Sequence, residues 1–447
     1  MKQNRHSRRL GTAGILTAVL CTPLVGTAQS GTDLVGIFGL AQNNDPTYIA
    51  AQYERDAAQE ARPQALGALL PSVDLAATAD VTNRDFKEPQ NGSDTFVDKS
   101  ITLTVTQPVY RRELFIAMRQ AKSSAVQAEV DYAFSLQDLM IRTATAYFNV
   151  LNAEDNLEFA TANRDAISQQ LKQAQQRFEV GLIAITGVEE AKARFDLARS
   201  SEILAKNQLD NAREALREIT GQNHQSLSQL KDDTPLSLPE PADIDAWTQT
   251  ALGQNLQIAS ASYNVDIARE EIQRARSGHY PTLDLVGRAS RTHATGGTIA
   301  ETHTDNQDAS VGLRFNLPLF RGGRTVSETR EARAQYQQTL REYEVVRRAI
   351  ERQTRESFLG VQAGIAQVQA LKQALVSNQA ALDAIRAGFQ VGTRTSVDVL
   401  DAQSDLFAAE LDYAEARYDY ILDILRLKQA AGTLSADDLG TVNQWLN

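Results

Sequence analysis

The chain has 447 residues, a net charge of −11 and a mean hydropathy of −0.34, and 42% of its residues are hydrophobic. This acidic composition argues against nucleic-acid binding, because phosphate recognition depends on clustered lysine and arginine. After residue 28 no run of about 18 apolar residues occurs, so we expect any membrane crossing to use strands.

Residues 1–28 have the pattern of a secretory signal peptide: a basic start, an apolar stretch over 10–25 and small residues over 26–28. The apolar stretch is too short and wrongly flanked for a spanning helix. One alternative is a twin-arginine signal, although the apolar motif expected after the arginine pair is missing. Another is a lipoprotein signal at Cys21, although Leu20 stands where a small residue is expected. Removal of 1–28 leaves no cysteine, so stability must come from burial and assembly.

The rest of the chain contains one unit twice. Two proline-centred segments recur 210 residues later, and a Val-Gly pair recurs 211 residues later. The matching positions are Pro71 and Pro281, Pro108 and Pro318, and Gly181 and Gly392. Long internal repeats determine the architecture of a protein. We therefore predict two structural repeats, over 29–221 and 251–432.

Each repeat begins with two predicted β-strands. Apolar and polar residues alternate over about ten residues, the length with which a tilted strand crosses a bilayer. The alternating stretches are 73–81, 101–109, 283–289 and 311–319. We expect the apolar residues to face lipid and the polar residues to face a wet lumen. Tyr110, Tyr280 and Phe320 lie at strand ends, where interfacial aromatic residues are typical.

Long polar loops are predicted over 83–99 and 292–308, between the strands of each pair. His293 and His303 fall in the second loop. The sequence contains no Walker loop, no HExxH motif and no Cys/His cluster. It therefore predicts no catalytic, cofactor or metal site, and the chain is not expected to be an enzyme.

A very long helix is predicted after each strand pair. No proline occurs between Pro108 and Pro235 or after Pro318, and interior proline would break a helix. The expected helices, 111–178 and 322–389, are each about 65 residues, or roughly 100 Å. Both end at Val-Gly, where glycine is the usual residue past a helix end.

A second helix follows each Val-Gly turn and carries a heptad pattern. Apolar residues step by three and four from Val188 to Ile219, and again from Val399 to Ala430. A sustained pattern of this kind predicts coiled-coil packing, and frequent alanine permits close approach. Because the turn is short, the partner is the preceding long helix, antiparallel to the second.

One chain supplies four strands, which cannot close a barrel, and an open sheet edge is not viable in lipid. The chain must therefore assemble. Two copies would give eight strands and three would give twelve, and these residues alone do not choose between them.

The chain resembles the TolC family of outer-membrane efflux channels over nearly all of its length after the signal. The most specific stretches are 144–153, 180–186 and 391–401. The resemblance implies an α+β membrane protein, a homotrimer with a transmembrane β-barrel in outer-membrane lipid and an α-helical coiled-coil barrel in the periplasm. It also implies an equatorial belt from 222–250 and 433–447.

The resemblance places partners and a gate at the hairpin tips. A periplasmic adaptor protein would dock on the tip turns, in series with an inner-membrane transporter. These turns are formed by Val180, Gly181, Leu182, Val391, Gly392 and Thr393. Asp398 and Asp401 would line the aperture, since residues three apart share a helix face and a ring of carboxylates attracts cations. Alternatively, Asp398 caps the helix together with Thr395; the residues alone leave both interpretations open.

The resemblance also implies a closed-state polar network of Gln170, Thr186, Phe389 and Arg394. Two positions depart from the family pattern: Gly187 replaces an acid, and Phe389 replaces a tyrosine and loses its hydroxyl. Glu189 or Glu190 could serve in place of the missing acid. We predict a closed state with fewer charge-assisted bonds than the family pattern; the alternative is closure mainly by helix packing.

The predicted function is a passive exit duct, serving efflux pumps, protein secretion or both and opened at its tip by the adaptor and pump. A trimeric adhesin is an alternative, since such proteins also donate four strands per chain and have coiled-coil stalks. Their strands lie at the C-terminus, however, whereas these strand pairs are internal and duplicated. An envelope enzyme is a further alternative, without a catalytic constellation to support it.

Overall fold

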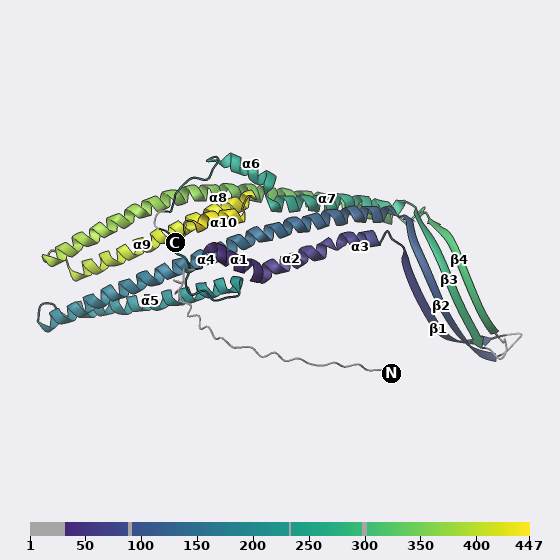
Figure 1. Cartoon of the computed structure of the whole chain (residues 1–447), viewed down its shortest axis with the longest axis horizontal. Helices are drawn as coiled ribbons and strands as arrows, with labels where there is room; N and C mark the ends of the chain where they lie inside the picture. The colour runs from purple at the N-terminus through teal and green to yellow at the C-terminus, as the bar shows by residue number, and fades with distance from the viewer. Residues whose placement is uncertain (1–31, 88–91, 232–233, 297–301) are drawn as a thin grey trace, which may run out of the picture.

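The computed structural model describes residues 32–87, 92–231, 234–296 and 302–447. The predicted signal peptide, 1–28, lies outside these residues. The molecule is elongated, with a bundle of long helices on one side and a four-stranded sheet at the opposite end (Figure 1). Within the described ranges, no helix combines the length and apolar character needed to cross a membrane.

Two long helical hairpins dominate the helical part. Helix α4 (Arg112–Glu179) has 68 residues and α8 (Arg324–Gln390) has 67. Each turns back into a helix of 36 residues, α5 (Ile185–Thr220) and α9 (Ser396–Ala431). Each pair packs along its length, α4 on α5 and α8 on α9. The predicted long helices and their antiparallel partners are therefore confirmed.

Most heptad residues of both second helices are buried, and each of these helices packs on the long helix before it. In α5 the buried residues are Val188, Ala191, Ala198, Ala205, Leu209, Leu216 and Thr220. In α9 the pattern continues from Val399, Ala402 and Leu406 through Ala409 and Ala416 to Leu427 and Ala430. Alanine at many of these positions lets the helix axes approach closely, as coiled-coil packing requires.

The sheet consists of β1 (Ser72–Phe86), β2 (Gly92–Tyr110), β3 (Thr282–Gly296) and β4 (Thr302–Asn316), in that order. All neighbours are antiparallel. The predicted length of about ten residues was wrong: three strands have 15 residues and β2 has 19. Most residues that were predicted to form loops belong to the strands. Ladder hydrogen bonds use backbone groups, so a strand can continue through polar side chains.

His293 and His303 correspondingly lie in β3 and β4 and not in a loop. Their rings are 5.4 Å apart, edge to face. The described residues contain no cluster of three His, Cys, Asp or Glu side chains placed to hold a metal ion.

The two strand pairs have the same register. In the first pair Ser72 lies opposite Thr106, and in the second Thr282 lies opposite Asn316. Each residue of the second pair lies 210 positions after its counterpart in the first. The sequence duplication is therefore a duplication of strand pairing as well.

Shorter elements surround the long helices. The helices before the first strand pair are α1 (Leu34–Asn44), α2 (Pro46–Gln59) and α3 (Ala61–Gly67), and those before the second are α6 (Ile244–Gln254), α7 (Leu256–Arg276) and the 3₁₀ turn η1 (Ser277–His279). Helix α7 packs between α4 and α8, whereas α2 and α3 pack on α4. Near the C-terminus, α10 (Ala436–Asn443) packs on α1.

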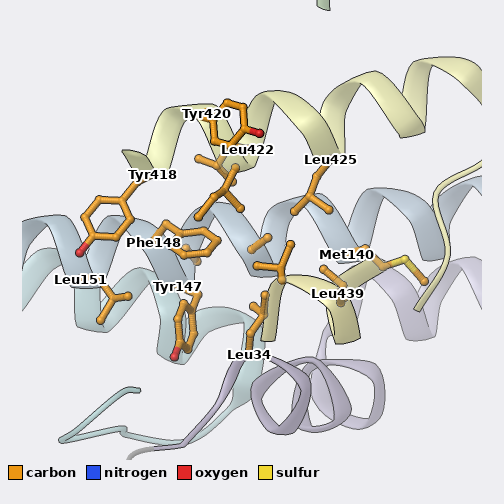
Figure 2. Packing of buried hydrophobic residues seen from close by; sticks show 14 of the residues in the cluster. Leu34, Met140, Tyr147, Phe148, Leu151, Tyr418, Tyr420, Leu422, Leu425 and Leu439 are labelled. Atoms are coloured by element: carbon orange, nitrogen blue, oxygen red, sulfur yellow. The ribbon is translucent and has the colours of Figure 1, made fainter. Parts of the chain in front are cut away.

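The largest hydrophobic core lies at mid-height, where α1, α4, α9 and α10 meet (Figure 2). Leu34, Tyr147, Phe148 and Leu439 are at most 1% exposed. The Tyr147 hydroxyl donates a 2.7 Å hydrogen bond to the Ser228 carbonyl, which satisfies its polar atom in this core. The core thus joins the start of the chain, both hairpins and the C-terminal segment.

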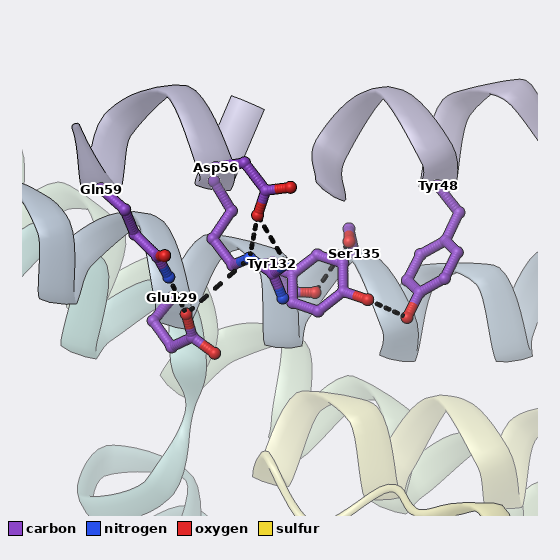
Figure 3. A network of polar contacts seen from close by, with 7 residues as sticks. Tyr48, Asp56, Gln59, Glu129, Tyr132 and Ser135 are labelled. Carbon is purple, nitrogen blue, oxygen red and sulfur yellow. Dashed lines mark hydrogen bonds and ion pairs between the residues drawn. The ribbon is translucent and has the colours of Figure 1, made fainter. Parts of the chain in front are cut away.

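Helix α2 is held on α4 by a polar and aromatic contact (Figure 3). The hydroxyls of Tyr48 and Tyr132 are 2.6 Å apart, and their rings stack with centroids 5.3 Å apart. The guanidinium of Arg55 lies 4.3 Å from the centre of the Tyr132 ring. Burial and the bond to Tyr132 raise the pKa of Tyr48 to about 12, so the Tyr48 hydroxyl is neutral at neutral pH.

Candidate functional site

The tips of both hairpins are built by the same turn. After α4, Gly181 has φ +76°, its N–H bonds to the Phe178 carbonyl at 2.8 Å, and the Leu182 N–H bonds to the Arg177 carbonyl at 2.8 Å. After α8, the same two bonds run from Gly392 and Thr393, and Gly392 has φ +81°. This is the Schellman motif, in which the left-handed position favours glycine.

The tip turns expose apolar side chains. Val180 is 70% exposed, Leu182 is 73% exposed and Val391 is 76% exposed. These residues, with Gly181, Gly392 and Thr393, are the predicted adaptor-docking positions. The structure places all six at the free ends of the hairpins (Figure 1).

Asp398 forms the capping box of α9. Its Oδ2 accepts hydrogen bonds from the Thr395 N–H at 2.7 Å and the Thr395 hydroxyl at 2.8 Å. The Asp398 N–H donates back to the Thr395 hydroxyl at 3.2 Å. The bonds from Thr395 lower the pKa of the Asp398 carboxyl below its usual value, so the group is negative at neutral pH. The capping interpretation therefore describes its contacts within one chain, and the remaining oxygen takes no part in these bonds.

Asp401 meets an arginine from the other repeat. The Arg194 Nη1 atom on α5 is 2.5 Å from the Asp401 Oδ1 atom, and Glu190 lies 3.8 Å from the same guanidinium. The Asp401 side chain is 58% exposed. Nearby, Ile167, Ala198 and Leu400 form a small apolar cluster between the hairpins. One of the two predicted aperture carboxylates is thus paired with a positively charged side chain.

Phe389 contacts a cation instead of a polar network. Its ring packs on the apolar cluster of α8 and α9, and the Arg177 guanidinium lies 4.8 Å from the ring centre. A cation over an aromatic face is favourable without any hydroxyl group. Arg177, from the end of α4, therefore links the two tips where the family pattern has a tyrosine.

Arg394 lies against the end of α8. A Cβ at Gly388 would come within 2.8 Å of the Arg394 Cγ, so glycine leaves room for this side chain. The Arg394 N–H also donates to the Gly388 carbonyl at 3.3 Å. Across the described part of the chain, Arg394 forms no ion pair, and Glu190, a predicted substitute for the missing acid, faces Arg194.

The other predicted network residues are not brought together within one chain. Gln170 is half-buried on α4, and Thr186 is exposed in the first turn of α5. In the described structure neither side chain bonds to Phe389 or Arg394. Gly187 has only the Ile183 side chain near its Cβ position.

Sequence reasoning missed Arg177 and Arg194. Arg177 directly precedes the Phe-Glu-Val-Gly end of α4, and its counterpart in the second repeat is the small Gly388. Arg194 lies three residues after the core position Ala191 and is partly covered. The asymmetry between the repeats was a signal for Arg177. Nothing local indicated the partner of Arg194, which is 207 residues away.

Comparison with known proteins gives consistent matches. The family model described as outer membrane efflux protein matches residues 37–222 and 247–433. The chain is 38% identical to outer membrane protein TolC of Vibrio cholerae over 96% of this chain and 98% of that protein. It is 36% identical to TolC of Escherichia coli (95% and 88% covered) and 29% identical to the alkaline protease secretion protein AprF of Pseudomonas aeruginosa (91% and 85%).

Solved structures share the fold. The outer membrane channel CmeC of Campylobacter jejuni matches with a TM-score of 0.76 and 16% identity, covering 98% of both chains. The outer membrane protein VceC of Vibrio cholerae matches with a TM-score of 0.71 and 22% identity, covering 89% of this chain and 96% of that one. These matches show the same arrangement of long helices and antiparallel strands.

Proposed function

The chain belongs to the family of outer membrane efflux proteins, and from this premise we propose that it is a passive exit duct through the outer membrane. The observation that carries this proposal is the sequence similarity, 38% and 36% identity, to the two TolC proteins over most of the length of each. The resemblance to AprF, a protease secretion protein, extends the proposal to type I secretion beside efflux. Energy for transport comes from an inner-membrane transporter, and the chain supplies the passage.

The assembly we propose is a homotrimer. The sheet of one chain is open at β1 and β4, and unpaired edges are not viable in lipid. Three copies would close a twelve-stranded barrel, within the range known for such barrels. The helical hairpins would form the tunnel below it. Their long helices, α4 and α8, are each roughly 100 Å long. The segments 222–250 and 433–447 would form the belt at mid-height, where Leu230 pairs with Leu446.

The gate we propose lies at the hairpin tips. Asp398 and Asp401 of three copies would surround the aperture, and the exposed turns at Gly181 and Gly392 would bind the adaptor. Gln170, Thr186 and Arg394 would contribute to closure between copies. With Gly187 and Phe389 in place, the contact between Arg177 and Phe389 would take over part of that role.

A trimeric adhesin is not favoured. Its barrel strands would lie in one C-terminal group, whereas β1–β2 and β3–β4 belong to separate repeats. None of the named relatives is an adhesin; they are channels, efflux proteins and secretion proteins.

The proposal is tested by single-channel recording of the purified protein in planar bilayers. We expect a small, steady conductance that a multivalent cation blocks from the side of the hairpin tips. Asp398→Asn combined with Asp401→Asn should weaken the block strongly, whereas Asp210→Asn, an exposed acid far from the tip, should not. Absence of any conductance from correctly folded protein would overturn the duct. Unchanged block in the double variant would show that the two aspartates do not line the aperture.

A further inference from the structure

A partly buried ion pair fixes the junction between the sheet and the long helices. Arg111, between β2 and α4, donates two 2.8 Å hydrogen bonds to the two carboxylate oxygens of Asp284 on β3. The Asp284 side chain is only 5% exposed. Bidentate pairs of this kind are strong and geometrically specific. The pair therefore holds the end of β2 on β3.

The duplication places the same two residue types at the open edges of the sheet. Counting 210 residues on from Arg111 gives Arg321, after β4, and counting 210 back from Asp284 gives Asp74, on β1. Both are exposed. Asp74 accepts only a long 3.4 Å bond from the Ser72 hydroxyl, and neither residue forms an ion pair in the described ranges. Arg321 and Asp74 are thus the two members of an equivalent pair, but they lie at opposite edges of the sheet.

The ends of the strands differ in the same way. The pairing of β1 with β2 stops at Thr106, and β2 continues to Tyr110 because β3 pairs with it there. Strand β4 stops at Asn316, the counterpart of Thr106. The following residues have no strand beside them, and Leu319 is 89% and Phe320 85% exposed. The second repeat thus has the sequence for the extension but lacks its partner strand.

The trimeric barrel proposed above closes by pairing β4 of one copy with β1 of the next. We propose that this pairing keeps the register that β2 and β3 have within a copy, and that Arg321 forms an intersubunit ion pair with Asp74. This inference rests on the proposed trimeric barrel and specifies its interface. In the observed register Leu103 lies opposite Ala289. The corresponding intersubunit position sets Leu313 opposite Ala79 of the neighbouring copy.

The ion pair has a physical task at this interface. Strands that pair mainly through backbone bonds can slip, and a slip of one residue turns every side chain to the other face. A slip of two residues preserves the faces but displaces the strands by about 6.8 Å, which separates the two charges. The same register sets Asp308 opposite Arg84, and opposite charges across a strand pair are favourable. Both contacts select one register.

Disulfide cross-linking tests the register. In a Cys21→Ala background, Leu313→Cys with Ala79→Cys should join chains into covalent trimers on non-reducing denaturing gels. The matched control is Leu103→Cys with Ala289→Cys, the same pair inside one chain, which should close without joining chains. A second control, Leu313→Cys with Val81→Cys, is two residues out of register and should cross-link about tenfold less, because a disulfide needs closely spaced Cβ atoms.

A charge exchange tests the ion pair. Arg321→Asp should lower the fraction of trimer that survives in SDS about tenfold, because it places two carboxylates together. Adding Asp74→Arg should restore the trimer. Arg324→Asp is the control, since the Arg324 side chain pairs with Glu328 of its own helix and the change should leave the trimer unchanged.

The outcomes separate this inference from the proposed function. A conducting trimer that cross-links equally well in the shifted register, or not at all, would overturn the interface and leave the duct intact. Failure of the exchanged pair to recover the trimer, when Arg321→Asp alone has weakened it, would overturn the ion pair. A protein that light scattering shows to be monomeric and that does not conduct would overturn both proposals.

Discussion

At the residue scale, the tip owes its charge to side chains from both repeats. Asp398 accepts hydrogen bonds within the capping box of its own helix, whereas Asp401 forms an ion pair with Arg194 across the hairpin interface. The two acids were predictable because they follow a recognisable turn at helical spacing. Their partners were not, because Arg177 and Arg194 act across contacts that only the folded chain creates. An exposed pair of this kind adds little stability, about 0–1 kcal/mol, so we expect its loss to change folding very little.

Arg194→Gln should strengthen cation binding at the tip. Removing the positive charge leaves Asp401 unpaired, so we expect a multivalent cation to block the channel at about threefold lower concentration. Unfolding by urea should be nearly unchanged. Arg199→Gln, at an exposed position on the same helix, is the control. Block that is identical in Arg194→Gln and the unaltered protein would show that Asp401 does not face the ion path.

The ion pair between Asp45 and Arg142 is a stability element away from the tip. Asp45 is 2% exposed, caps α2 through the Tyr48 N–H at 2.7 Å, and receives Arg142 at 2.9 Å. Burial by itself would raise the pKa of Asp45, but the bonds from Arg142 and Tyr48 outweigh it and hold the pKa below its usual value. Because the folded pKa is depressed, the pair stabilises the fold above the unfolded value, and this stability is lost as the pH falls through the folded pKa.

Arg142→Met should therefore destabilise the protein by about 3 kcal/mol in urea unfolding at neutral pH, because a buried carboxylate loses its counter-charge. Adding Asp45→Asn should recover most of the loss, since asparagine retains the cap without a charge. The contrasting variant is Arg352→Met, whose partner Glu356 is 60% exposed, and it should cost less than about 1 kcal/mol. A loss in Arg142→Met that Asp45→Asn does not reduce would assign the cost to packing instead.

At the scale of elements, helices were easier to predict than strands. Long proline-free segments ending in glycine gave α4 and α8 to within two residues at each end. The strands were predicted too short because the prediction followed alternation of apolar residues. Ladder pairing continues through Thr, Asn and Asp residues that do not alternate, as the pair of Asn83 with Thr95 shows. Backbone pairing, unlike burial, has no signature in side-chain polarity.

Two glycines in the same left-handed conformation should respond differently to alanine. Gly392 has φ +81° and open space around its Cβ position, so Gly392→Ala should cost only the backbone strain, about 1–2 kcal/mol. Gly432 has φ +76° and faces the backbone of Gln254 and Asn255. Gly432→Ala should therefore cost several kcal/mol, because rigid backbone must also move. Urea unfolding of both variants measures the difference, and equal losses would show that the clash at Gly432 is relieved by small shifts.

At the scale of the whole molecule, the duplication is the organising fact. Two strand pairs with one register, and two hairpins with one type of tip, make a single chain a pair of similar wall segments. Sequence predicted this division and the need for assembly, since four strands cannot close. The sequence could not fix the number of copies, because each added chain contributes four strands and several totals could close a barrel. The proposed number of three follows from the resemblance to the family.

The most direct measurement is an electron cryo-microscopy map of the purified protein in a lipid nanodisc. We predict three copies around one axis, a closed barrel with β4 of each copy beside β1 of the next, and a tapered helical tunnel with Asp398 and Asp401 directed to the axis at the tips. A map with another number of copies, an open sheet, or tips whose aspartates point away from the axis would contradict the account.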